Sequence, residues 1–108
     1  MNLISISKPE LKTNPAFHLV LANIDFSKLN ITKNQFIEKL LKKKIISQFH
    51  YIPIYQFGLF KNKFRKLDGC EKYKDTTVSL PIHLKISNAK QVFIIKTIKS
   101  IIKKCKTN

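Results

Sequence analysis

One stretch decides the fold, residues 32–45, and it reads TKNQFIEKLLKKKI. Thr32 and Gln35 have the spacing of a capping box, in which each side chain bonds a backbone amide that the helix leaves unpaired. Apolar residues follow at helical spacing, at positions 36, 37, 40, 41 and 45. The lysines at 42–44 fall in the last turn, where cations favour the helix dipole. The stretch therefore predicts an amphipathic helix with one face on a core.

Strands are predicted on both sides of this helix. Residues 16–26 are rich in β-forming residues and mostly apolar on both faces, as a central strand would be. Residues 45–54 alternate loosely and end near Pro53, so we expect a second strand there. Residues 78–81 predict a short strand that Pro81 stops. Between these last two strands, 55–68 reads as an irregular excursion and 70–77 as one or two helical turns.

A second long helix is predicted over residues 88–104, with Asn88 and Gln91 as its cap and an isoleucine-rich stripe along it. The fold class is therefore α+β, a small three-stranded sheet with two helices packed on one face. Residues 1–15 are polar and contain two prolines, so they predict a lead-in with little structure. Residues 16–108 predict one small domain.

Composition sets limits on function. A chain of 108 residues has room for one modest core, too little for separate cofactor and substrate domains. Its 21 basic and 6 acidic residues give a net charge of +15, but Arg65 is the one arginine. Proteins that read nucleic acids normally keep arginine for bidentate pairing. Nucleic acid is therefore an unlikely partner on composition alone.

Location and metal chemistry are also constrained. Cys70 and Cys105 stand far apart with no metal-ligand spacing, which indicates two free thiols in a reducing cytoplasm and no metal site. The N-terminus lacks the pattern of a signal peptide. The longest uncharged stretch, residues 45–60, is shorter and more polar than a membrane span needs. We expect a cytoplasmic protein without a membrane partner.

Two local features could carry function. His50 and Tyr51 stand at a predicted strand end beside Pro53, where a scaffold presents polar groups to a cleft; alternatively they simply alternate between sheet faces. Residues 57–66 interleave three phenylalanines with four basic residues. This pattern suits a small basic nucleic-acid-binding module, the alternative function. The competing interpretation is a solvated loop whose phenylalanines enter the core.

Several motifs occur in a fixed order: His18-Leu19-Val20, Ile24-Asp25-Phe26, the capped helix, His50-Tyr51-Ile52-Pro53, Cys70-Glu71-Lys72-Tyr73 and Val78-Ser79-Leu80-Pro81. In this order, over about residues 8–104, the chain resembles the C-terminal part of the DegT/StrS family of sugar-nucleotide aminotransferases. The match is closest to members that act on a UDP-linked 4-keto-6-deoxy amino sugar in pseudaminic-acid-type bacterial surface-glycan biosynthesis. The chain departs from the family pattern at Ser47, Leu59, Phe60, Cys70 and Lys74.

The resemblance implies pyridoxal phosphate (PLP) as the cofactor of the full enzyme, with a nucleotide sugar and glutamate as substrates. In the family, the Schiff-base lysine and the phosphate cup lie in a large N-terminal domain, so no catalytic or cofactor-binding residue is expected here. The resemblance places His50, Tyr51 and Tyr55 beside the substrate. It implies a fragment, split subunit or decayed copy that is inactive alone and pairs with a large-domain chain or in a homodimer.

Overall fold

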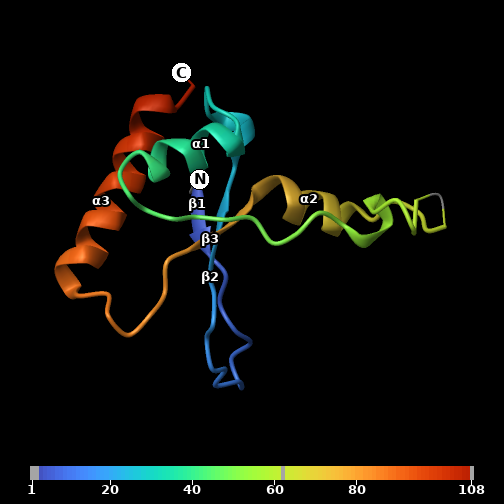
Figure 1. The fold of residues 1–108 in the computed structure, drawn as a ribbon, viewed down its shortest axis with the longest axis horizontal. Helices are drawn as coiled ribbons and strands as arrows, with labels where there is room; N and C mark the ends of the chain where they lie inside the picture. Colours follow the sequence, from blue (N-terminus) through green and yellow to red (C-terminus); the bar gives the residue numbers. More distant parts are fainter. Residues whose placement is uncertain (1–2, 62, 108) are drawn as a thin grey trace.

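The computed structural model describes residues 3–61 and 63–107. Its sheet has three antiparallel strands in the order β1-β2-β3, with β1 at Ile4–Ile6, β2 at Val20–Ile24 and β3 at Thr77–Leu80. The central strand β2 places Ala22 opposite Val78 of β3. The 13-residue connection from β1 to β2 extends away from the rest of the molecule (Figure 1).

The first long helix, α1 at Lys33–Leu41, forms as the sequence predicts. Thr32 accepts from the Gln35 amide, and the Gln35 side chain accepts from the Thr32 amide, so the capping box is complete. The helix ends in a Schellman turn. Its hydrogen bonds run from the Ile45 amide to the Leu40 carbonyl and from the Lys44 amide to the Leu41 carbonyl. Lys44 adopts a left-handed conformation, with φ at 60°.

The second long helix is α3 at Asn88–Cys105, and it is capped one residue earlier than predicted. The Ser87 hydroxyl accepts from the Lys90 amide, so Ser87 and not Asn88 is the N-cap. A shorter helix, α2 at Asp68–Thr76, replaces the one or two turns expected at 70–77. Single 3-10 turns, η1 at Phe26–Lys28 and η2 at Ile54–Gln56, lie between the longer elements.

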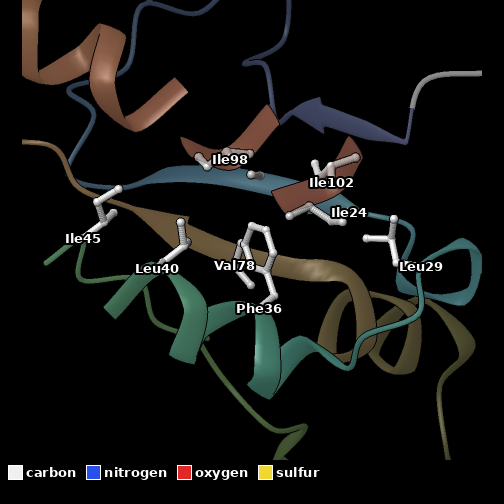
Figure 2. Packing of buried hydrophobic residues seen from close by; sticks show 9 residues of the cluster. Ile24, Leu29, Phe36, Leu40, Ile45, Val78, Ile98 and Ile102 are labelled. Carbon is white, nitrogen blue, oxygen red and sulfur yellow. The ribbon is translucent and has the colours of Figure 1, made fainter. Parts of the chain in front are cut away.

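The core lies on one face of the sheet, where α1 and α3 both pack. Phe36 of α1 and Ile102 of α3 point toward Ile24 of β2 (Figure 2). The cluster consists of Ala22, Ile24, Leu29, Phe36, Leu40, Ile45, Val78, Ile98 and Ile102. The other face is polar, with hydrogen bonds from Thr77 to Asn23 and from Asn23 to Ser7, and α2 lies against it. The predicted class, a three-stranded sheet with two helices on one face, is confirmed.

The strand membership differs from the prediction in two places. Residues 45–54 form no strand; they run beside β3 with one bridge pair, Gln48 to Ser79. The third strand is instead β1, inside the lead-in that was expected to hold little structure. The predicted strand over 16–26 is reduced to Val20–Ile24. A three-residue strand gives too short an alternation to stand out in the sequence.

Residues 52–76 form an arm that leaves this core. It consists of the segment from Ile52 to Leu67 followed by α2, and it projects to one side of the molecule (Figure 1). The radius of gyration is 15.5 Å, whereas a compact domain of this length would have about 13 Å. The arm and the β1–β2 connection account for the difference.

Candidate functional site

The segment that carries His50 is fastened to β3. After the Schellman turn, Gln48 and Ser79 exchange backbone hydrogen bonds of 3.3 and 2.7 Å. The Ser47 hydroxyl donates to the Ser79 carbonyl at 2.7 Å. These contacts hold the backbone at Ser47 and Gln48 to β3, so the position of the backbone just before His50 is fixed.

The Ser79 hydroxyl is the hydrogen-bond partner of His50. Its oxygen lies 3.1 Å from His50 Nε2 and 3.2 Å from the Gln48 carbonyl, to which it can donate. Nδ1 of the same ring is buried and has no hydrogen-bond partner among the described residues. A buried polar atom without a partner is uncommon, which makes this ring a candidate for contact with a ligand.

Tyr51 lies against the same ring. The two ring centroids are 4.9 Å apart in an edge-to-face arrangement, and Tyr51 is 72% exposed. The peptide bond that joins them is cis. Both residues line a hollow of about 460 Å³ together with Ile37, Ser47, Gln48 and Phe49. The structure thus brings His50 and Tyr51 together, with an exposed aromatic face beside a hydrogen-bonding ring.

Tyr55 lies apart from them, in the arm. Its hydroxyl donates to the Glu71 carboxylate at 2.8 Å and accepts from the Leu67 amide at 3.3 Å. Gln56 and Lys74 donate to the same carboxylate at 2.9 and 2.6 Å. Three side chains from two segments thus converge on Glu71, and this cluster ties the start of the arm to α2.

Electrostatics in the cluster agree with this geometry. The hydrogen bond from Lys74, then that from Tyr55, lowers the pKa of the Glu71 carboxyl. Its partner Lys74 has a raised pKa, chiefly through the same bond. Burial raises the pKa of Tyr55, and the Glu71 carboxylate raises it further. At neutral pH the cluster is an ion pair with a neutral phenol.

Three contributors to the site were not singled out from the sequence. Ser79 stands in the motif Val78-Ser79-Leu80-Pro81, and the alternation of β3 could have placed it on the face opposite Val78. Ser47 carries no such signal. Lys33 of α1 donates to the Lys74 carbonyl and lies 4.9 Å from the Phe49 ring centre. Lys33 therefore joins α1, the His50 segment and α2.

The aromatic and basic loop 57–66 is exposed, and Asn62 lies outside the described residues. Phe57 is 46% and Phe64 60% exposed, so the interpretation that placed the phenylalanines in the core is wrong. Phe60 and Phe64 contact each other, with ring centroids 6.2 Å apart. The loop thus presents apolar surface to solvent.

The described lysines do not fit a PLP site. A Schiff-base lysine must be able to lose its proton and must face the cofactor. Just three of the described lysines are partly buried: Lys28 pairs with Asp25 at 2.9 Å, Lys74 pairs with Glu71, and Lys33 bonds a backbone carbonyl. The pKa of Lys33 is lowered by burial, but its amine is engaged.

In residues 3–61 and 63–107, no three His, Cys, Asp or Glu side chains gather as metal ligands would. No helix of this part of the chain has the length and apolarity to cross a bilayer. Cys70 and Cys105 are free thiols.

Comparison with known proteins gives the family. Residues 2–99 match the DegT/DnrJ/EryC1/StrS aminotransferase family. The chain is 32% identical over 81 residues to UDP-4-amino-4,6-dideoxy-N-acetyl-beta-L-altrosamine transaminase of Helicobacter pylori, a match that covers 73% of this chain and 21% of that protein. The sequence match and the order of the motifs therefore point to the same family.

Solved structures agree with this match. PseC of Helicobacter pylori, an aminotransferase involved in the biosynthesis of pseudoaminic acid, superposes with a TM-score of 0.72 at 25% identity, over 81% of this chain and 24% of that one. The PLP form of Spr1654 from Streptococcus pneumoniae gives 0.79 at 25% identity, over 97% and 28%. This chain thus spans about a quarter of the length of the proteins it matches.

Proposed function

The chain belongs to the DegT/DnrJ/EryC1/StrS aminotransferase family, and from this premise we propose that it is the C-terminal small domain of a PLP-dependent sugar-nucleotide aminotransferase. The proposed substrate is a UDP-linked 4-keto-6-deoxy amino sugar in bacterial surface-glycan biosynthesis, with glutamate as amino donor. The observation that carries this proposal is the family match over residues 2–99, joined to the likeness to the Helicobacter pylori transaminase. The chain alone is inactive, because its lysines do not fit PLP.

His50 and Tyr51 border the nucleotide sugar in this proposal. Tyr51 offers an exposed ring for packing against a sugar or a base. His50 offers Nδ1, which has no partner among the described residues, for a hydrogen bond to the substrate. Tyr55 contributes to the substrate side of the domain by holding the start of the arm to α2 through Glu71.

A large domain supplies the cofactor site in this proposal, either from a partner chain or from a second copy that completes a homodimer. PLP there carries the amino group between the two substrates. The cytoplasm is the proposed location, since nucleotide sugars are made there and both cysteines are free.

A chimera tests the proposal. Residues 3–107 replace the matching segment of the Helicobacter pylori transaminase, and amino transfer from glutamate to the UDP-linked keto sugar is measured. We expect activity from the chimera and none from the 108-residue chain mixed with PLP. Turnover by the chain alone, or a folded chimera without activity, would refute the assignment.

The role of His50 is tested in the same chimera. We expect His50→Ala to lower kcat/KM about tenfold or more, the scale of one lost hydrogen bond to substrate. His83→Ala is the matched control, because His83 is exposed in the loop before α3. Equal losses in both variants would remove His50 from the site.

A further inference from the structure

A second hollow lies between α1 and α3, away from His50, and two helix faces line it. Lys39, Lys42 and Lys43 contribute from α1 and its C-terminal end, at the spacing of a single helix face. On α3 the lining residues also fall on one stripe: Phe93, Lys96, Thr97, Ser100, Ile101, Lys104 and Cys105. The hollow has a volume of about 510 Å³. We name it the lysine groove.

The charge of the lysine groove is uniform. Five lysines line it and none of the six acidic residues does. The ion pairs found among residues 3–61 and 63–107 join Lys28 and Lys74 to Asp25, Glu71 and Asp75, so no groove lysine has an acidic partner within 4.0 Å. Like charges gathered in one concavity repel each other and focus a positive potential there. An anion with several charges would relieve that repulsion.

The shape and the aromatic residue favour one class of polyanion. Phe93 is 50% exposed at one end of the groove, and an exposed ring among lysines is the arrangement on which unpaired bases stack. A flat bilayer would touch the rims of a concave groove and leave its floor empty. The lining stripe of α3 runs from Phe93 to Cys105, about 18 Å at the helical rise per residue, which is long enough for several successive phosphates.

We propose that the lysine groove binds single-stranded nucleic acid without regard to sequence. Lysine is a point charge that pairs with phosphate but lacks the planar fork that reads bases. The site therefore differs from the arginine-based reader that composition argued against, and it lies away from loop 57–66. This activity is independent of amino transfer. The expected affinity is that of non-specific binding, with Kd about 10⁻⁴–10⁻⁶ M at physiological salt.

Fluorescence anisotropy tests the groove with the full chain and a labelled oligodeoxythymidine of about 12 nucleotides, within the site sizes of single-strand binders. Binding is measured from about 50 to 200 mM salt. The groove variant carries Lys39→Gln, Lys43→Gln and Lys96→Gln. The control carries Lys61→Gln, Lys63→Gln and Lys66→Gln, three exposed lysines of the loop, so both lose the same charge.

We expect the slope of log affinity against log salt to fall by about 2 in the groove variant, since each phosphate contact with a single strand contributes about 0.7. The control should keep its slope. An equal fall in both variants would mean attraction to net charge, and a larger fall in the control would place the site on the loop; either result overturns the proposal. Circular dichroism verifies that both variants remain folded.

Two further measurements separate a nucleic acid from other anions. Phe93→Leu keeps an apolar side chain at this position and removes the ring, so we expect affinity for the oligonucleotide to drop roughly tenfold and affinity for inorganic polyphosphate to stay unchanged. Equal loss for both ligands would contradict base stacking. Binding to vesicles of anionic phospholipid that exceeds binding to the oligonucleotide would replace the proposed ligand with a membrane surface.

Discussion

The core of the molecule and its arm, residues 52–76, are stabilised by different kinds of interaction. In the core, α1, α3 and two strands bury Phe36, Ile24, Leu40 and Val78 completely. In the arm, apolar residues as large as Leu59 and Phe64 face solvent, and the Glu71 cluster holds the start of the arm to α2. Hydrophobic burial therefore specifies the core, whereas directional polar contacts hold the arm. The arm thus presents apolar surface that suits contact with a second domain or chain.

The largest expected effect lies in the core. Phe36→Ala should lower the free energy of unfolding by about 3–5 kcal/mol, because a fully buried ring leaves a cavity. Phe57→Ala in the arm should cost less than about 1 kcal/mol, since that ring is already half in water. Urea denaturation measures both. Comparable losses would erase the distinction between the two regions.

A smaller effect is expected at Ser79 of β3, which contacts the segment that leads into the arm. Ser79→Ala removes the hydroxyl that bonds His50 Nε2, so we expect a changed ratio of imidazole tautomers and a loss of about 1 kcal/mol in stability. Nitrogen-15 NMR of the ring reads the tautomer directly. Ser47→Ala is the control: it also removes a buried hydroxyl but should leave the tautomer unchanged. The same tautomer ratio in both variants would contradict this role of Ser79.

The arm should loosen in acid before the core does. The pKa of Glu71 is lowered in the folded chain, so its contribution is present above the carboxyl's ordinary pKa and disappears as the pH falls through the folded value. Protection of the Leu67 amide, which donates to Tyr55, should therefore decrease severalfold below about pH 4. Hydrogen exchange corrected for intrinsic rates measures it.

Glu71→Gln should show the loosened arm already at neutral pH, and Asp68→Asn on the same helix should not. Protection that is insensitive to pH in the unsubstituted chain would show that the cluster does not hold the arm.

The smallest effect concerns one backbone position at the end of α1. Lys44 has a positive φ, which glycine adopts without strain. Lys44→Gly should stabilise the chain by about 0.5 kcal/mol, whereas Lys43→Gly should destabilise it by a similar amount. Thermal unfolding distinguishes the two signs. Destabilisation by both would show that the Schellman turn does not limit stability.

The elements that were predicted correctly are those whose formation depends on residues close together in the sequence. Thr32 with Gln35 and the apolar stripe behind them located α1, because both signals lie within a few residues. The prediction of a strand at 45–54 was wrong, because contacts with residues distant in the sequence decide the conformation of this segment. Ile45 enters the core through the turn after α1, and Gln48 then meets β3 at one pair only. The apolar alternation that suggested a strand therefore occurs in a loop that one bridge pair joins to β3.

The candidate site was predictable in part. His50 and Tyr51 were named from their motif, and the structure places them side by side. The clustering of Tyr55 with Glu71 depends on how the arm folds back on α2 across 16 positions, which no local pattern encodes. The groove lysines likewise showed helical spacing in two separate segments, but only the packing of α1 against α3 brings them to one hollow.

The end of α3 is joined to the segment after β2. The Thr107 amide and hydroxyl both donate to the Lys28 carbonyl, and the Asn30 amide donates to the Cys105 carbonyl. During synthesis, residue 107 follows residue 28 by about 4 to 16 seconds at ordinary elongation rates. Until then Ile24, Phe36 and Leu40 have no complete cover on the ribosome. A nascent chain with this topology is a target for chaperones that bind apolar segments, and its folding is completed late.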